Sequence, residues 1–359
     1  MKLLNPRAWA VSLRRVWRER DYLTPLKLAN IGLVNLQWLL RTEVVVGRPY
    51  LLVIEPTNIC NTNCQLCPIG QGHSKRLKGV IRWEEFRNLI DRHSRWIHRL
   101  NLSMWGEPLV AHGIYRMIQY AHRARVWTCF STNLHAFRPE CGDDEAMVSS
   151  GLDGLTCSLH AASQSTYEIY QPGKDFARLL AKIKRLIDTR RRMGSETPRI
   201  HLSFVVTRYN EHEMSAFVQL ARDLGCEPKF IAPSLNLRFL GPMDRDRETE
   251  NRLRTWLPRN PEYVKEPYRL MLSGAGVEKL TGGHRFNQCK RLWTAADITW
   301  DGTVVPCSAP CTHDEAFGDL SVETLGRIWN GSKYRAARRS MTRPVHDDVV
   351  CARCCGNAL

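Results

Sequence analysis

The sequence predicts an α/β fold built around a parallel β-sheet. From residue 50 to residue 233, six short apolar runs alternate with segments of helical periodicity. Strands and helices in regular alternation are typical of parallel strands joined by crossover helices. Six units are fewer than the eight of a complete barrel, so this pattern leaves both an incomplete barrel and a doubly wound sheet open. In either fold, active-site residues follow the C-terminal ends of the strands.

Each element is expected from its own periodicity. Short continuous apolar runs predict strands at 51–55, 99–104, 126–131, 154–159, 199–207 and 228–232. Apolar residues recurring every three or four positions predict helices at 82–94, 113–123, 143–150, 175–193 and 211–224. Beyond Pro233 the periodicity fades and prolines are scattered, which indicates a linker or insert over 234–288. In the last segment, 289–359, a β-hairpin is expected from Ile298 to Val305 with Asp301-Gly302 as its turn.

Residues 1–49 form a basic segment, with nine Lys or Arg against three Asp or Glu. Trp9, Leu13, Val16 and Trp17 recur at helical spacing, which predicts a basic amphipathic helix. One interpretation is a helix that lies on a membrane surface or docks on a partner. The other is a helix packed on the catalytic domain through its Trp face, and the general burial of apolar stripes favours it.

The composition excludes several classes of protein. With 359 residues, 43% of them hydrophobic and 25% charged, the chain is neither disordered nor a small disulfide scaffold. Its net charge of +16 predicts attraction to nucleic acid, anionic lipid, a phosphorylated substrate or an acidic protein. The first residues lack the apolar core of a signal peptide, and no apolar stretch reaches the length of a bilayer span. Of the thirteen cysteines, we therefore expect the clustered ones to serve metal binding or redox chemistry, in a cytoplasmic protein.

Three cysteines, Cys60, Cys64 and Cys67, follow the first expected strand. Three thiolates this close together can ligate three irons of a [4Fe–4S] cluster and leave the fourth iron open to a small molecule. The alternative is a zinc site completed by His73 or another side chain, because structural zinc takes four ligands.

The spacing Cys60-x3-Cys64-x2-Cys67 resembles the signature of the radical S-adenosylmethionine (radical SAM) superfamily. Met104-Trp-Gly106-Glu107-Pro108 is similar to that family's second-strand Gly-Gly-Glu motif, with Trp in place of the first Gly. Ser131-Thr-Asn133 resembles its ribose-facing motif.

Two later segments continue the resemblance in the family's order. Residues 154–170, which include Ser158 and His160, are similar to the fourth-strand motif, and 205–213 resemble the fifth-strand motif. His160 stands where relatives usually have Asp, so it is either a proton acceptor or a hydrogen-bonded structural histidine. The resembling stretch covers about 50–233.

The resemblance implies a specific chemistry. In the family, the open iron chelates S-adenosylmethionine, one electron cleaves its C5′–S bond, and the 5′-deoxyadenosyl radical abstracts a substrate hydrogen. It implies that Glu107, beside Gly106, accepts a hydrogen bond from the cofactor's amino group. Asn133 is then expected at the ribose and Ser158 near the methionine carboxylate.

A second set of cysteines lies near the C-terminus. Cys289, Cys307, Cys351 and Cys354, with the segment Gly318-Asp-Leu to Trp329-Asn330 between them, resemble the SPASM or shorter twitch extension of radical SAM enzymes. The resemblance implies one auxiliary [4Fe–4S] cluster with every iron ligated, suited to electron transfer. A zinc site is the alternative for four cysteines that end in Cys-x2-Cys. The remaining nearby thiols are Cys311 and Cys355.

We therefore expect a partial (β/α)6 TIM-like barrel with a small C-terminal iron–sulfur extension and a helical N-terminal segment. The expected division is a basic helical N-terminal segment at 1–49, a radical SAM core at 50–233, a linker or insert at 234–288 and the auxiliary cluster domain at 289–359. The expected function is a radical modification of an unidentified substrate. The candidate substrates are acidic or phosphorylated molecules, peptides and membrane-associated molecules. We favour a net oxidation. The alternative is an epimerisation, in which a thiol returns a hydrogen atom to the substrate.

The partners expected for this reaction are an external electron donor such as a flavodoxin or ferredoxin, and a membrane contacted peripherally through the N-terminal helix. The non-enzymatic alternative is a zinc-stabilised basic protein that binds nucleic acid or a membrane. Iron content separates this alternative from the radical enzyme.

Overall fold

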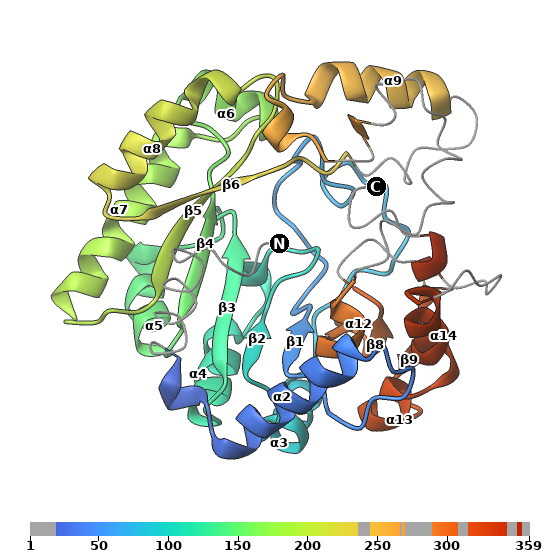
Figure 1. Cartoon of the computed structure of the whole chain (residues 1–359). Helices are drawn as coiled ribbons and strands as arrows, with labels where there is room; N and C mark the ends of the chain where they lie inside the picture. Colours follow the sequence, from blue (N-terminus) through green and yellow to red (C-terminus); the bar gives the residue numbers. More distant parts are fainter. Residues whose placement is uncertain are drawn as a thin grey trace, which may run out of the picture.

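The computed structural model describes residues 19–235, 245–265, 268–269, 289–307, 315–342 and 350–353. It confirms the α/β class, with a mostly parallel sheet curved as a partial TIM-like barrel (Figure 1). Six parallel strands stand in the sheet in their sequence order. They are β1 (Leu51–Ile54), β2 (Arg99–Asn101), β3 (Trp127–Thr132), β4 (Gly154–Ser158), β5 (Arg199–Val205) and β6 (Glu227–Ile231).

The crossover helices follow the strands as the periodicity predicts. They are α3 (Trp83–His93), α4 (Ile114–Arg123), α5 (Asp143–Ser149), α7 (Phe176–Arg192) and α8 (Met214–Asp223). A further short helix, α6 (Gln164–Tyr170), lies between β4 and α7 and was not predicted. Figure 1 shows α5, α7 and α8 along the outer side of the sheet, so their apolar faces cover it there.

The C-terminal region continues the same sheet. Strand β7 (Ala295–Ile298) pairs in parallel with β1, and β8 (Thr303–Val305) and β9 (Gly318–Asp319) follow antiparallel. The hairpin expected at this point is therefore confirmed, and Gly302 adopts the left-handed backbone (φ 86°) that its turn requires. Around it pack α12 (Arg291–Thr294), α13 (Leu325–Trp329), α14 (Ser332–Ser340) and the short helix η10 (Val350–Arg353).

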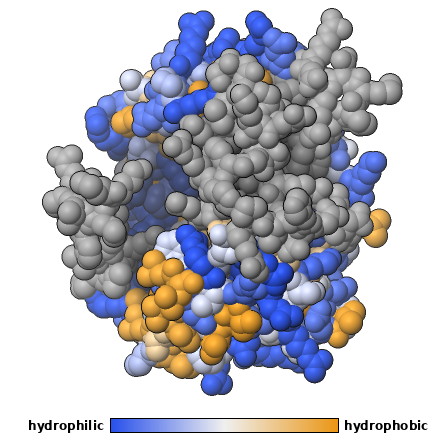
Figure 2. All heavy atoms as spheres, turned by 45° about the vertical axis from the view of Figure 1, so that its right-hand side comes forward, coloured by the Kyte–Doolittle hydropathy of each residue, from blue (hydrophilic) through white to orange (hydrophobic). Residues whose placement is uncertain are grey.

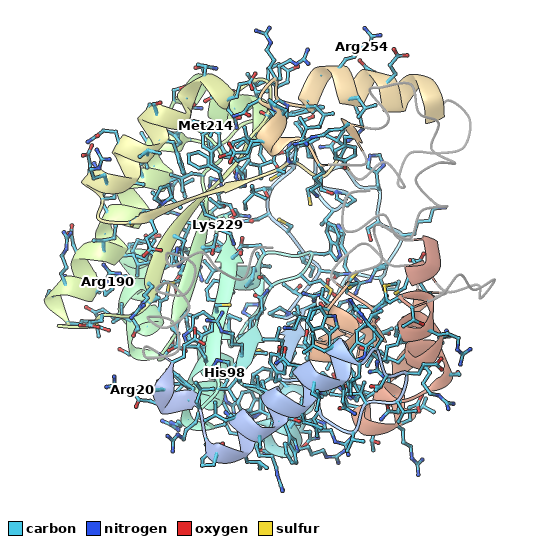
Figure 3. The ribbon with its side chains drawn as sticks, viewed as in Figure 1. Arg20, His98, Arg190, Met214, Lys229 and Arg254 are labelled. Atoms are coloured by element: carbon cyan, nitrogen blue, oxygen red, sulfur yellow. The ribbon has the colours of Figure 1, made fainter. Side chains whose placement is uncertain are left out.

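The N-terminal part of the chain lies beneath the strands. The helix expected from Trp9 to Trp17 is outside the described residues. A short turn, η1 (Arg20–Tyr22), leads into α2 (Pro25–Leu39). The buried carboxylate of Glu19 pairs with His98 and Arg99 at the start of β2, and Figure 3 shows Arg20 and His98 at this end of the molecule. No helix among the described residues is both long and apolar enough to cross a membrane.

The expected linker contains a helix, α9 (Arg245–Trp256), and a second apolar cluster. Leu253 and Leu257 pack there with Leu66 of the cysteine loop (residues 60–67). The segment after β6 therefore packs against the same loop that carries the first three cysteines.

Candidate functional site

The cysteine loop begins six residues after β1 ends at Ile54. Thr62 lies between two of its thiols, because its Oγ1 is 3.2 Å from the Sγ of Cys60 and 3.5 Å from the Sγ of Cys64. The backbone of Gly70 packs directly on Cys64, where a Cβ at position 70 would stand 2.7 Å from the Cys64 nitrogen. The loop is thus folded back on itself, with Cys60 and Cys64 gathered around one hydroxyl.

Burial governs the ionisation of two of these thiols. It raises the pKa of Cys64 to about 12, against the opposing effect of the Thr62 hydroxyl, and it raises the pKa of Cys67 above its usual value. A thiolate is the metal-binding form, so these ligands require the positive charge of a metal centre to lose their protons. Three thiolates are a donor set that suits zinc or an iron–sulfur cluster.

Glu107 joins the second-strand motif to the cysteine loop. Its backbone N–H donates to the Ile59 carbonyl at 2.9 Å. The adjacent Gly106 packs so closely on the same segment that a Cβ there would lie 2.0 Å from the Thr57 oxygen. A residue with any side chain at position 106 would push the motif away from the loop.

The Glu107 carboxylate is fully enclosed by donors of the protein. It accepts hydrogen bonds from the Thr132 hydroxyl at 2.6 Å, the Asn133 N–H at 2.7 Å and the Leu109 N–H at 3.1 Å. Burial nevertheless raises the pKa of Glu107 to about 7, because it outweighs these three bonds. The carboxylate therefore fixes the position of the chain at the end of β3.

Asn133 in turn contacts the cysteine loop directly. Its amide nitrogen donates to Asn61 Oδ1 at 2.9 Å and lies 3.3 Å from Thr62 Oγ1 and 3.7 Å from Cys60 Sγ. The structure thus brings Glu107, Asn133 and Cys60 together at the C-terminal edge of the sheet. Ser158 ends β4 at the same edge, opposite Ser203 of β5.

His160 has a structural environment. Its backbone is left-handed (φ 59°), its Nδ1 accepts from the Val205 N–H at 3.1 Å, and its carbonyl accepts from the Asn210 amide at 2.7 Å. Burial lowers the pKa of His160 to about 4, so the ring is neutral at physiological pH. Of the two interpretations of this residue, the geometry favours the hydrogen-bonded structural histidine.

Several contacts of the cysteine loop were not expected from the sequence. Gln65 N–H donates to the carbonyl of Tyr170 in α6 at 3.1 Å, and Lys174 Nζ donates to the Asn61 carbonyl at 3.1 Å. The buried Glu55 carboxylate accepts two hydrogen bonds from Arg76, at 3.1 and 2.6 Å. Arg76 has no distinctive spacing from the cysteines, so no motif marks this pair.

The second site is built around a buried ion pair in the C-terminal region. Arg291 Nη2 donates to Asp297 Oδ2 at 2.6 Å, and Arg291 lies close enough to Cys289 and Cys307 to interact with both electrostatically. Tyr334 interacts in the same way with Asp297 and Cys351. Cys289 and Cys307 thus lie near the ion pair and Cys351 lies near Tyr334, while Cys354, Cys311 and Cys355 lie outside the described residues.

Two polar atoms of this site have no hydrogen-bond partner. They are Nε of Arg291 and the Tyr334 hydroxyl, both buried. Buried donors are normally satisfied, and the sulfides of an iron–sulfur cluster accept such hydrogen bonds. The residues present therefore fit a cluster beside Cys289, Cys307 and Cys351.

Within the described part of the chain, no three His, Cys, Asp or Glu side chains converge as ligands of one metal ion. The three thiols of a [4Fe–4S] site each bind a different iron, so they are not expected to converge on one point.

Two family models match the segments that carry the two cysteine sites. A model of the radical SAM superfamily matches residues 54–221, and a model of the SPASM iron–sulfur cluster-binding domain matches residues 289–355. The chain contains a radical SAM domain and a SPASM domain. Its two domains imply a [4Fe–4S] cluster with S-adenosylmethionine in the first, and auxiliary iron–sulfur ligation in the second.

Individual relatives of this radical SAM protein are distant. GTP 3′,8-cyclase of Alkaliphilus oremlandii is 24% identical over 266 residues, 71% of this chain and 79% of the relative. Mycofactocin maturase of Mycobacterium tuberculosis is 26% identical over 183 residues, 49% of this chain and 43% of that protein. Streptococcus suis SuiB bound to S-adenosylmethionine has a similar fold, with a TM-score of 0.56 and 13% identity over 86% of this chain and 72% of SuiB.

Proposed function

We propose that this radical SAM protein catalyses a two-electron oxidation of its substrate, with one auxiliary [4Fe–4S] cluster as the electron acceptor. The observation that carries the proposal is the pairing of two cysteine sites in one sheet, the cysteine loop after β1 and the Arg291–Asp297 site on the adjacent β7. An oxidation needs an acceptor for an electron, and a second cluster near the first supplies one.

In the proposed oxidation the substrate would lose one hydrogen atom, then one further electron and one proton. When bound at the cysteine loop, a cluster and S-adenosylmethionine would supply the hydrogen abstraction, with methionine and 5′-deoxyadenosine as products. An external one-electron donor, such as a flavodoxin or ferredoxin, would supply the electron for that cleavage. A cluster held by the second cysteine site would accept the remaining electron of the substrate, and the proton would go to solvent.

The protein's own residues hold and orient the reacting groups. Cys60, Cys64 and Cys67 ligate the first cluster, and Asn133 stands beside Cys60 to contact the ribose. Glu107, with Gly106, fixes the chain on which Asn133 stands. Its Oε2 accepts a single bond, from the Asn133 N–H, and its other lone pair is assigned to the cofactor's amino group. Ser158 at the end of β4 is assigned to the methionine carboxylate. Cys289, Cys307, Cys351 and Cys354 ligate the auxiliary cluster.

The substrate class is proposed from charge and from the structural neighbours. The +16 net charge favours an acidic or phosphorylated substrate, and a peptide is supported by the structure of the SuiB fold neighbour bound to its precursor peptide SuiA. We place the protein in the cytoplasm, with the N-terminal region in peripheral contact with a membrane.

Replacing Cys311 distinguishes oxidation from epimerisation. A thiol donor would return a hydrogen atom to the substrate radical, whereas oxidation needs no such donor. We expect Cys311→Ala to retain substrate turnover within about threefold, because single changes outside a reacting set have small kinetic effects. The measurement is product formation by mass spectrometry in D2O. Complete loss of product with an intact cluster content, or solvent deuterium at the reacting carbon of the wild-type product, would contradict oxidation.

A further inference from the structure

Helix α2 has its polarity reversed. A helix on the surface of a water-soluble domain presents polar residues to water and apolar residues to the core. In α2 every exposed position is Pro, Leu, Ala or Gly. The exposed leucines on the helix and its C-terminal cap are Leu26, Leu28, Leu33, Leu36, Leu39 and Leu40, with exposed fractions from 40 to 66%.

Three of the four polar residues of α2 face the protein instead, and the fourth, Asn35, bonds a carbonyl of its own helix. Lys27 is buried and its Nζ donates to the Arg125 carbonyl, with a pKa that burial lowers to about 8. Asn30 exchanges two hydrogen bonds with the backbone of Arg48, and Gln37 accepts from the Gly47 N–H at 3.0 Å. These bonds fix the rotation of the helix about its axis, so the leucine face is held outward by specific contacts.

The leucine face extends into a larger patch. Val44 and Val46, in the loop after α2, are 52 and 73% exposed. Figure 2 shows a continuous hydrophobic area at the lower left of the molecule, where α2 lies. A contiguous exposed patch of this kind marks an interaction surface.

Cations lie at the C-terminal end of α2, and the exposed Asp21 before its N-terminus is paired with Arg20. At the C-terminal end of α2, the Arg41 guanidinium and the Lys290 ammonium both lie over the ring of Trp38, at 5.0 and 4.7 Å from its centroid. Glu43, the next carboxylate along the chain, is paired with Arg339. The eighteen residues before Glu19 carry five Lys or Arg and no Asp or Glu. An apolar face with Trp and cations at its edge is typical of proteins that sit at a lipid interface.

We propose that the leucine face of α2, with Val44 and Val46, docks on the surface of an anionic lipid bilayer. The leucines enter the region between headgroups and acyl chains, and the surrounding cations pair with anionic headgroups. A second copy of the chain is a poorer occupant, because it would bring two strongly basic molecules together at this face. This inference does not depend on the reaction proposed above.

The docking surface defines the orientation of the enzyme. Helix α2 contacts segments that precede the strands, such as Arg125 before β3, whereas the cysteine loop follows the C-terminal end of β1. Figure 1 shows α2 and the C-terminal edge of the sheet at opposite ends of the molecule. A bilayer below α2 therefore leaves the candidate active site facing the aqueous side, where it takes a soluble or projecting substrate.

The test is sedimentation of the full-length protein with vesicles of phosphatidylcholine and phosphatidylglycerol. We compare the wild type with Leu36→Gln and with the double variant Leu33→Gln/Leu36→Gln, which change no charge. Val322→Gln is the matched control, because Val322 is 83% exposed and lies in the C-terminal region, away from α2 in the chain. We expect the double variant to bind about tenfold or more weakly, since it removes two apolar insertions, and the control to bind as the wild type does.

Two results would overturn the proposal. One is vesicle binding that is equal in the wild type and the double variant, which would assign any attraction to net charge alone. The other is a wild-type dimer in light scattering that the double variant dissociates, with no vesicle binding by either. Unchanged melting temperatures for the three variants establish that folding is not the cause of a loss. We prefer point substitutions to deletion of α2, because Lys27, Asn30 and Gln37 form hydrogen bonds with the backbone of the rest of the protein.

Discussion

We expect Glu107→Gln to lower formation of 5′-deoxyadenosine from S-adenosylmethionine at least about 100-fold. The Glu107 carboxylate accepts three hydrogen bonds, and one of them holds the Asn133 backbone beside Cys60. A glutamine amide has one acceptor oxygen, so its NH2 group must face at least one of these donors. The loop after β3 then shifts, and the cofactor is held away from its reacting geometry.

The measurement is chromatographic quantification of 5′-deoxyadenosine after reduction with dithionite. Iron analysis shows first that the variant still holds its clusters. Glu84→Gln is the matched control, since Glu84 is an exposed glutamate on α3. A Glu107→Gln variant that keeps its iron and cleaves S-adenosylmethionine within about threefold of the wild-type rate would remove Glu107 from the site.

The second large effect is expected at Arg291. The Asp297 side chain is fully buried and Arg291 donates to both of its oxygens. Arg291→Met leaves that carboxylate without its counter-charge, which is expected to cost about 3–5 kcal/mol of unfolding free energy. The double variant Arg291→Met/Asp297→Leu removes both charges and is expected to recover most of that loss. Urea unfolding of the reconstituted proteins measures the two effects.

The double variant also tests the contact of Arg291 with the auxiliary cluster. Arg291 brings a positive charge and an unpartnered buried N–H next to Cys289 and Cys307, and both favour the reduced cluster. Because the double variant removes the Arg291 and Asp297 charges together, loss of the N–H is the change expected to lower the reduction potential of that cluster, by some tens of millivolts. An unchanged potential in a double variant that retains its iron would show that Arg291 acts only on Asp297.

Much of the catalytic half was predictable from the sequence, because its signals are local. The alternation of strands and helices predicted strands β1 to β6 within a few residues, and the spacing of Cys60, Cys64 and Cys67 predicted the ligand set. Glu107 and Asn133 were found through their motifs. Their mutual hydrogen bond and the contact with Cys60 depend on the packing of three strands, which no local pattern encodes.

Helix α2 shows why other parts of the structure were not predictable from the sequence. The segment that became α2 is apolar with Lys27, Asn30 and Gln37 interspersed, and periodicity alone assigns its polar positions to solvent. The structure buries those positions because Arg125, distant along the chain, and Arg48 and Gly47, in the loop after α2, offer them backbone partners. The parallel pairing of β7 with β1 is likewise a contact across more than two hundred residues.

The central claim is that this chain holds two iron–sulfur centres and that the first cleaves S-adenosylmethionine. The most direct test compares anaerobically reconstituted wild type with the Cys60/Cys64/Cys67→Ala triple variant for iron, acid-labile sulfide and 5′-deoxyadenosine. We expect about eight irons in the wild type, about four in the variant, and the nucleoside from the wild type alone. Zinc in place of iron, with no nucleoside from either protein, would contradict the account.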